Sequence, residues 1–300
     1  MTIKAIKDFP EARVDIVFVH GLQTDQKSWT SEDGVYWPAT LLPKLVNNAR
    51  ILAYESEDIT VEKIWNTEDY LSEIANELCD DLVGMRSGEA AQRPIIFIAH
   101  SLGGLVCKHA LNRAANDEDK KQVVESALGL MLLGTPYYTS ANISEAGKFF
   151  RLAQQDVPGP DELVAKSQNL FESGNEFEDL RQNASLKLKI FFEGAPTKVN
   201  DEEFKVVEST VAALPDTQKQ SLRIGYNHHG MSCFKDENDK EFKKIFTPLK
   251  TWLGSIPEPE EKGAVNNISK STFDRSTNNG WQLGQNAGNV NGFTINQKGK

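Results

Sequence analysis

The segment 94–104, Pro-Ile-Ile-Phe-Ile-Ala-His-Ser-Leu-Gly-Gly, constrains the fold of this chain more than any other stretch. Its run of Ile and Phe is typical of a strand buried on both faces, and apolar residues recur at helical spacing through 104–115. A buried strand, a tight turn at a serine and a following helix together form a nucleophile elbow. Small neighbours such as Ala99 and Gly103 prevent clashes there. We therefore predict that Ser101 presents its hydroxyl at the edge of a parallel sheet.

Two backbone amides are candidates for an oxyanion hole around Ser101. The amide of Leu102 stands at the start of the helix, where it points to the position of a developing oxyanion. The apolar run 14–19 ends in a His-Gly-Leu turn upstream of the elbow, and a turn in that position supplies the second donor in hydrolases with this elbow. We predict that the amide of Leu22 is this second donor, and that Gly21, which has no side chain, allows the backbone to approach closely. A structural role is predicted for three histidines: His20, His100 and His109.

The general base is expected late in the chain, because the order for this elbow is serine, then acid, then histidine. Only His228 and His229 follow the elbow and its helix, and they lie in the loop-like segment 225–234 before a helical stretch at 239–252. A catalytic histidine belongs in such a loop. The alternative is that both are surface histidines in a turn.

A carboxylate between nucleophile and base would orient the histidine. The segment 186–192 alternates and then becomes apolar, as a strand does, and Glu193 follows it directly with turn residues behind. We predict Glu193 as this acid. The same chain order also permits three other carboxylates: Asp201, Glu208 and Asp216.

The motifs together resemble a known family. They are His20-Gly-Leu, Trp29 and Trp37, 48–54, 96–106, Leu133-Gly-Thr-Pro136 and His228-His-Gly-Met-Ser-Cys-Phe234. This combination, over nearly all of residues 10–253, resembles the fungal lipase/esterase-like α/β-hydrolases that stand in front of NOD-like receptor proteins or are encoded beside them. That family is in turn similar to eukaryotic lipases that include relatives of GPI-inositol deacylase. The resemblance implies Ser101 as nucleophile, His228 as base and Glu193 as acid.

One segment departs from the family pattern. Relatives usually show Gly-Thr-Pro-His-x-Gly-Ser after the sixth strand, whereas this chain has Gly-Thr-Pro-Tyr-Tyr-Thr-Ser at 134–140. The departure leaves the triad intact, but the loop borders the nucleophile. We expect Tyr137 and Thr139 to alter substrate choice or to reduce activity.

The rest of the chain predicts one α/β-hydrolase domain at 1–254, with a mainly parallel sheet covered by helices on both faces. We predict strands near 15–19, 50–54, 95–99, 128–133, 187–192 and 205–207. A helix is predicted over 60–85, because Ile64, Leu71, Ile74, Leu78 and Leu82 recur at helical spacing.

The segment 139–185 is charged and punctuated by Gly and Pro, with a helix expected at 145–155. It occupies the position at which lids occur in this fold, so one interpretation is a lid that gates the substrate. The other is a plain surface excursion.

Charge and cysteine content limit the partners and the compartment. A net charge of −10 disfavours nucleic acid, because phosphates would be repelled over most of the surface. The three cysteines are odd in number and widely spaced, which indicates neither a disulfide framework nor a metal cluster. We expect no metal and no cofactor. Without a signal sequence or a membrane-spanning stretch, the expectation is a cytoplasmic protein.

The last forty residues change in character. A charged linker at 255–262 leads into a disordered tail at 263–300 that is rich in Asn, Gly, Ser and Gln. Within 276–297 two short apolar pairs flank a Gly/Asn-rich turn, a pattern that allows in-register stacking between molecules. This segment resembles the fungal amyloid signalling motifs that couple NOD-like receptors to effectors. The alternative is a tail that is disordered and only solubilising.

These observations predict a serine hydrolase that cleaves a carboxylic ester or a lipid through an acyl-enzyme. The resemblance adds a cell-death effector role triggered by a NOD-like receptor through the tail. The competing hypothesis is a catalytically idle adaptor whose fold only carries the amyloid motif. The acyl chain, the alcohol and the oligomeric state are left open by the sequence.

Overall fold

The computed structural model describes residues 2–22, 25–56, 59–66, 69–214 and 217–258. The chain divides into two units, Met1–Pro257 and Glu258–Lys300, and the account below concerns the first. The predicted tail at 263–300, with its amyloid motif at 276–297, lies outside the described residues, as does the second half of the predicted linker, 259–262.

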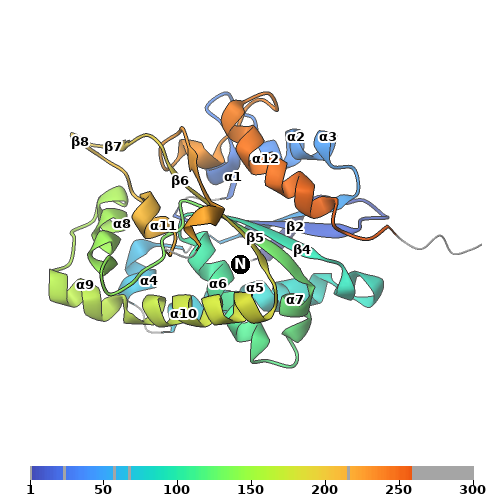
Figure 1. The fold of residues 1–300 in the computed structure, drawn as a ribbon, viewed down its shortest axis with the longest axis horizontal. Helices are drawn as coiled ribbons and strands as arrows, with labels where there is room; N and C mark the ends of the chain where they lie inside the picture. Colours follow the sequence, from blue (N-terminus) through green and yellow to red (C-terminus); the bar gives the residue numbers. More distant parts are fainter. Residues whose placement is uncertain (1, 23–24, 57–58, 67–68, 215–216, 259–300) are drawn as a thin grey trace, which may run out of the picture. The chain divides into compact units, whose positions relative to one another are not determined.

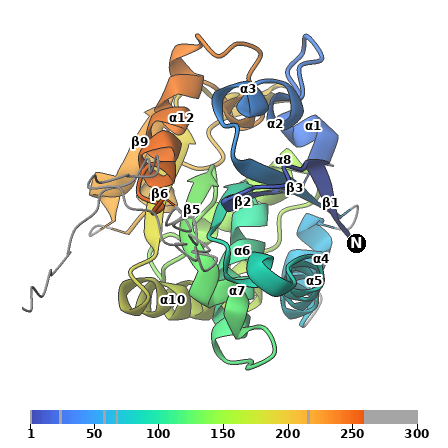
Figure 2. The same ribbon diagram turned by 90° about the vertical axis from the view of Figure 1, so that its right-hand side faces the viewer.

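A sheet of seven strands, in the spatial order β1-β3-β2-β4-β5-β6-β9, forms the centre of the first unit (Figures 1 and 2). β1 is antiparallel to β3, and every other neighbouring pair is parallel. The strands are β1 Thr2–Lys7, β2 Val14–Val19, β3 Ala49–Glu55, β4 Ile95–His100, β5 Ala127–Leu133, β6 Lys187–Glu193 and β9 Ser221–Ile224. A separate hairpin pairs β7 Thr197–Val199 with β8 Glu202–Phe204.

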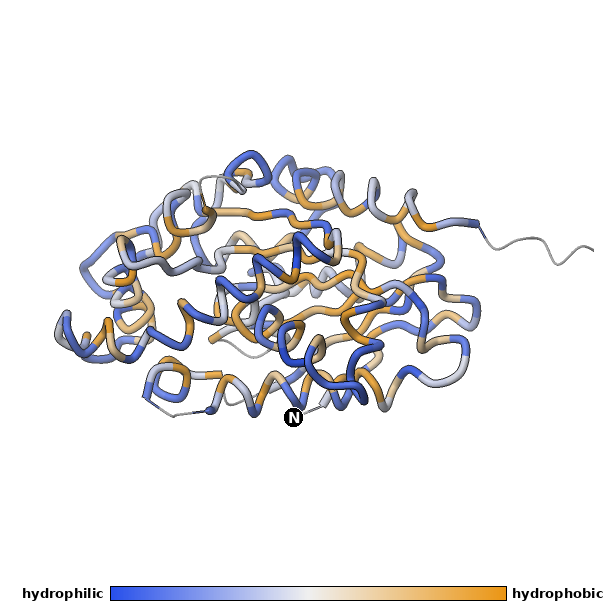
Figure 3. The backbone as a smooth tube through the Cα atoms, turned by 60° about the horizontal axis from the view of Figure 1, so that its bottom comes forward, coloured by the Kyte–Doolittle hydropathy of each residue, from blue (hydrophilic) through white to orange (hydrophobic). Residues whose placement is uncertain are grey.

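Both faces of this sheet are buried, and alternate residues of each central strand enter different cores. Val17 and Val19 of β2 belong to one hydrophobic cluster, whereas Ile16 and Phe18 belong to the other. The hydropathy colouring shows long hydrophobic stretches of backbone running through the middle of the molecule (Figure 3). This burial on two sides explains why these strands are apolar runs rather than alternating segments.

Helices form a layer on each face of the sheet (Figure 1). One layer contains α5 Tyr70–Met85, α6 Gly103–Ala115, α7 Lys121–Ser126 and α10 Gln168–Asn183. The other contains α1 Asp25–Trp29, α2 Trp37–Thr40, α3 Leu42–Leu45 and α12 Lys240–Leu253. Four short helices complete this unit: α4 Val61–Asn66, α8 Gly147–Leu152, α9 Pro160–Lys166 and α11 Ser209–Ala212. The chain therefore has the α/β-hydrolase fold, as predicted.

Five predicted strands are confirmed, and the sixth, 205–207, is wrong. Those residues lie between β8 and α11, where the amides of Val206 and Val207 bond to a buried carboxylate instead of a neighbouring strand. The seventh position of the sheet belongs to β9, whose burial is too mixed to give a clear apolar run. The predicted helix 60–85 is two helices, and α5 begins after Asp69, which has a left-handed φ of 65°. The helix predicted at 145–155 is present but shorter, because α8 spans Gly147–Leu152 after a 3₁₀ turn at Ile143–Ala146.

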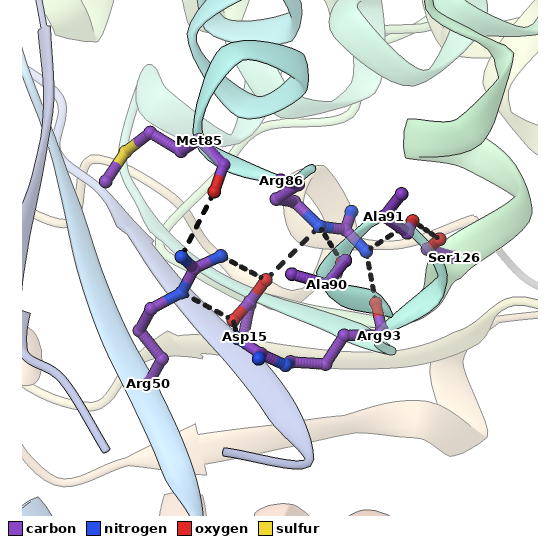
Figure 4. A network of polar contacts seen from close by, with 8 residues as sticks. All are labelled: Asp15, Arg50, Met85, Arg86, Ala90, Ala91, Arg93 and Ser126. Atoms are coloured by element: carbon purple, nitrogen blue, oxygen red, sulfur yellow. Dashed lines mark hydrogen bonds and ion pairs between the residues drawn. The ribbon is translucent and has the colours of Figure 1, made fainter. Parts of the chain in front are cut away.

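Asp15, at the amino end of β2, is fully buried among three arginines (Figure 4). Arg50 binds both carboxylate oxygens, at 2.9 and 2.8 Å, and Arg93 and Arg86 approach to 3.0 and 3.2 Å. The Arg86 guanidinium also donates to the carbonyls of Ala90 and Ala91. Burial, together with its like-charged neighbours, lowers the pKa of Arg86 to about 10. This network ties β2 and β3 to the end of α5 and to the turn that leads into β4.

Candidate active site

Ser101 lies in the turn between β4 and α6 with a φ of 57°, a left-handed conformation that is strained for a serine. Its amide donates to the carbonyl of Leu133 at 2.8 Å, which holds the turn against the end of β5. Gly103 is required because a Cβ there would lie 2.2 Å from the carbonyl oxygen of His20. The predicted strand, turn and helix around Ser101 are thus all present.

The His228 imidazole faces this serine. Its Nε2 lies 2.8 Å from Ser101 Oγ, and both residues are about 1% exposed. Two backbone contacts fix the loop that carries His228: its amide donates to Thr197 Oγ1 at 3.0 Å, and its carbonyl accepts from His100 Nε2 at 2.8 Å. The ring is thereby held in place to accept the hydroxyl proton of the serine.

Glu193, the last residue of β6, lies on the other side of the imidazole. Its Oε1 is 2.7 Å from Nδ1 of His228, and its side chain is completely buried. The amides of Val207 and Val206 donate to Oε1 and Oε2 at 2.8 and 2.9 Å. These bonds satisfy the buried carboxylate and aim it at His228, which requires the tautomer with a proton on Nδ1.

The other predicted acids do not reach the imidazole. Glu208 forms an exposed ion pair with Lys148 at 3.2 Å, and Asp201 is exposed in the turn between β7 and β8. Asp216 lies outside the described residues. The structure brings Ser101, His228 and Glu193 together.

The turn after β2 lies directly against the elbow. A Cβ added at Gly21 would be 2.6 Å from Ser101 Cβ and 3.0 Å from the amide nitrogen of Leu102. His20 sets the orientation of this turn: its Nε2 accepts from the amide of Ser56 at 2.9 Å, so its protonated Nδ1 donates to the Gly21 carbonyl at 3.0 Å. Carbonyl and N–H of one trans peptide point in opposite directions, so fixing this carbonyl also fixes the Leu22 amide.

The remaining histidines have structural surroundings. Burial, and to a lesser degree His228, holds the pKa of His100 well below its ordinary value, so its ring stays neutral. Burial also lowers the pKa of His109 to about 4. His109 bridges Ser72 of α5 and Ser173 of α10, at 2.9 and 2.8 Å. His109 thus joins two helices, while His100 touches the loop of His228 itself.

The insertion at 139–185 contributes α8, α9 and α10. Phe149 of α8 packs edge-on against the His228 ring with centroids 5.8 Å apart, and it stacks on Trp65 of α4. The indole N–H of Trp65 donates to Ser167 Oγ at 2.9 Å, between α9 and α10. One part of the insertion therefore covers the histidine, whereas α10 packs on α6 through Asn112 and Ser173.

At the departure from the family pattern, 134–140, Tyr137 and Thr139 contact residues outside the triad. The Tyr137 ring lies over the Lys108 ammonium at 4.8 Å, and its hydroxyl donates to Asn175 at 3.3 Å. The amide of Thr139 donates to Asn142 at 2.7 Å. Both residues thus stabilise the junction between the loop, α6 and the insertion.

Three contributors to the site are not apparent from the sequence. Thr197 anchors the amide of His228, and the amides of Val206 and Val207 anchor Glu193. These are backbone or hydroxyl contacts that carry no motif of their own. His100 has the structural role predicted for it, and its position next to Ser101 in the sequence indicates that it can also contact the site.

Within the described ranges, no group of three or more His, Cys, Asp or Glu side chains is placed to bind a metal ion. No helix among these residues combines the length and apolar character that a membrane span needs.

Residues 14–141 match the model of the family described as "Putative serine esterase (DUF676)". The match covers less than half of the chain, and it includes the His-Gly turn and the elbow but neither Glu193 nor His228. The supported assignment is therefore the coarser one, similarity to a family of serine esterases.

Among curated proteins, the chain is similar to Protein SERAC1. The Danio rerio protein is 26% identical over 210 residues, and the Homo sapiens protein is 24% identical over 208. Each match covers 62% of this chain and 31% of the relative, so the chain matches about a third of their length.

Solved structures with similar backbones include MenH from S. aureus, at 14% identity and a TM-score of 0.46, covering 84% of this chain and 99% of that one. The Bacillus licheniformis lipase BlEst2 has 16% identity and a TM-score of 0.45, covering 82% and 97%. By its own strand order and elbow, the chain has the α/β-hydrolase fold, and it is similar to the serine esterase family matched at 14–141.

Proposed function

We propose that this protein is a serine esterase that hydrolyses a carboxylic ester through an acyl-enzyme. The observation that carries the proposal is the continuous chain of contacts from Ser101 Oγ to His228 Nε2, 2.8 Å, and from His228 Nδ1 to Glu193 Oε1, 2.7 Å. The left-handed turn of Ser101 and the family match at 14–141 support it.

In the proposed mechanism, Ser101 Oγ attacks the ester carbonyl while its proton passes to His228 Nε2. Glu193 accepts the Nδ1 hydrogen bond and stabilises the imidazolium that forms. The amides of Leu22 and Leu102 bind the oxyanion, and His228 returns the proton to the leaving alcohol. Water, deprotonated by the same imidazole, then hydrolyses the acyl-enzyme and releases Ser101.

Hydrolysis of p-nitrophenyl butyrate tests this function. We expect turnover by the wild type and a loss of about 10³-fold or more in kcat for Ser101→Ala and for His228→Ala. Ser144→Ala, at a serine of the insertion outside the triad, is the matched control and should retain activity. Equal rates for wild type and Ser101→Ala would refute the proposal.

The alternative, a catalytically idle adaptor, predicts no turnover above background from any ester. The argument for an idle adaptor is the presence of Tyr137 and Thr139 near the nucleophile. These two residues contact Lys108, Asn175 and Asn142 instead. These contacts leave the triad in working geometry, so they favour the esterase.

A lid role for the α8 part of the insertion, a cytoplasmic location and a receptor-triggered effector role belong to the same proposal. The contact between Phe149 and His228 supports the lid. The location rests on the cysteine pattern, and the effector role rests on the sequence of 276–297. A peptide of residues 276–300 should form thioflavin-positive fibrils, and a peptide that stays monomeric at high concentration would contradict the role of the tail.

A further inference from the structure

We infer that the cavity beside His228, bounded by α4 and the end of α8, receives a short, uncharged acyl group of the ester. This inference rests on the proposed esterase function and names its substrate class. The cavity has a volume of about 370 Å³. That volume is near the lower end of the range for small-molecule sites, roughly 300–1,000 Å³.

Three contacts place the cavity next to the reacting groups. Its wall contains Leu22, whose amide is the proposed oxyanion donor, and His229, whose ring centroid is 6.0 Å from that of His228. Leu152 and Ala153, which also line it, end the helix that places Phe149 on the His228 ring. The alkyl part of an acyl group attached to Ser101 could thus extend from its carbonyl carbon into the cavity.

Five of the side chains that line the cavity are apolar. Ile59 and Val61 are almost completely buried, and Leu22, Leu152 and Ala153 are partly buried. Contact between such side chains and methylene groups is favourable, because it removes apolar surface from water on both sides. The cavity therefore favours an alkyl chain over a polar one.

None of the described residues that line the cavity is Asp, Glu, Lys or Arg. The polar members are Thr60, Gln154 and Gln155, which carry no charge, and His229. Burial and the neighbouring His228 lower the pKa of His229, and its buried Nδ1 has no hydrogen-bond partner among the described residues. A carboxylate or phosphate here would lose its hydration without gaining a counter-ion. The described lining of the cavity therefore disfavours an anionic acyl group.

A chain-length series tests the inference by kinetics. Wild type should hydrolyse p-nitrophenyl butyrate and hexanoate with a kcat/KM at least 10-fold above that of the palmitate and of the p-nitrophenyl monoester of succinic acid. Ala153→Trp, which fills the cavity, should lower the values for butyrate and hexanoate at least 10-fold and that for acetate less than 3-fold. Ala184→Trp, at the exposed end of α10, is the matched control and should change none of them.

Binding without turnover separates this inference from the esterase proposal. In saturation-transfer NMR, Ser101→Ala should bind methyl butyrate but not monomethyl succinate, and adding Ala153→Trp should abolish the butyrate signal. Binding of both ligands, or a signal unaffected by Ala153→Trp, would overturn the cavity assignment. Sensitivity to the length of the alcohol instead of the acyl chain would overturn it as well. Normal binding with no turnover of any ester would refute the esterase and leave the cavity in place.

Discussion

His100 Nε2 donates a hydrogen bond of 2.8 Å to the backbone carbonyl of His228, so the residue that precedes the nucleophile also holds the proposed base. Because burial keeps His100 neutral, its Nε2 proton is present throughout the ordinary pH range. The link joins the end of β4 to the loop before α12, two segments more than a hundred residues apart in the chain.

Removal of this donor is expected to reduce kcat. His100→Phe keeps a ring but loses the bond to His228, and we expect kcat to fall about 10-fold, the equivalent of one hydrogen bond, with KM changed less than 2-fold. His100→Gln retains a donor and should recover part of the loss. Steady-state kinetics with one ester measures kcat and KM for the wild type and both variants. A change confined to KM would contradict the positioning role of His100.

Glu193→Gln tests the acid. The amide group of glutamine cannot accept from Val206, Val207 and His228 at once, so the imidazole loses its orientation. We expect kcat to fall about 10³-fold to 10⁴-fold, measured under saturating substrate. Glu208→Gln, at an exposed carboxylate, is the control and should keep full activity. Equal effects of the two substitutions would show that Glu193 is not the acid.

Lys108 predicts a pH dependence of stability. It is buried against Tyr137 and Phe177, and burial lowers its pKa from 10.5 to about 8. Between these two values the unfolded chain binds more protons than the folded one, so the free energy of unfolding should rise with pH. The destabilisation caused by burying the charged Lys108 ammonium is fully present below about pH 8 and disappears above about pH 10.5.

Lys108→Met should remove this dependence. Urea titrations should show the wild type gaining about 2 kcal/mol relative to the variant between about pH 7 and pH 10. Lys121→Met, at a half-exposed lysine paired with Glu118, should behave like the wild type. Parallel stability curves for wild type and Lys108→Met would contradict the lowered pKa.

Asp15 is expected to contribute to stability but not to chemistry. Asp15→Asn leaves Arg50, Arg86 and Arg93 buried or half-buried without a counter-ion, so we expect a loss of about 3–5 kcal/mol in the free energy of unfolding. Asp33→Asn, at an exposed pair with Lys235, is the control and should leave the free energy of unfolding nearly unchanged, because water screens that pair. Asp15 and the elbow lie at opposite ends of the strands, so kcat of the folded variant should stay unchanged.

Residues with a local chemical requirement were predictable from the sequence. Ser101 sits where only small neighbours fit, and a mainly apolar run predicts each of the strands β2, β4 and β5. Asp239, which caps α12 by accepting from the amide of Glu241 at 2.7 Å, marks the helix that follows the histidine loop.

Features that depend on distant segments were not predictable. The strand-end pattern predicts Glu193 as the acid, but chain order alone also permits Glu208, because spacing along the chain does not encode which carboxylate faces His228. The segment 205–207 has the apolar character of a strand, but its amides are taken by the Glu193 carboxylate. Three arginines contact Asp15 from sequence positions up to 78 residues away, and no sequence motif predicts these contacts.

The most direct measurement is the site of covalent modification by a fluorophosphonate, located by peptide mass spectrometry on the intact chain. The account predicts a single phosphonylated serine in the peptide that contains Ser101, and no adduct on that peptide in His228→Ala. Modification at a different serine, or an unmodified Ser101 in protein that hydrolyses esters, would contradict it.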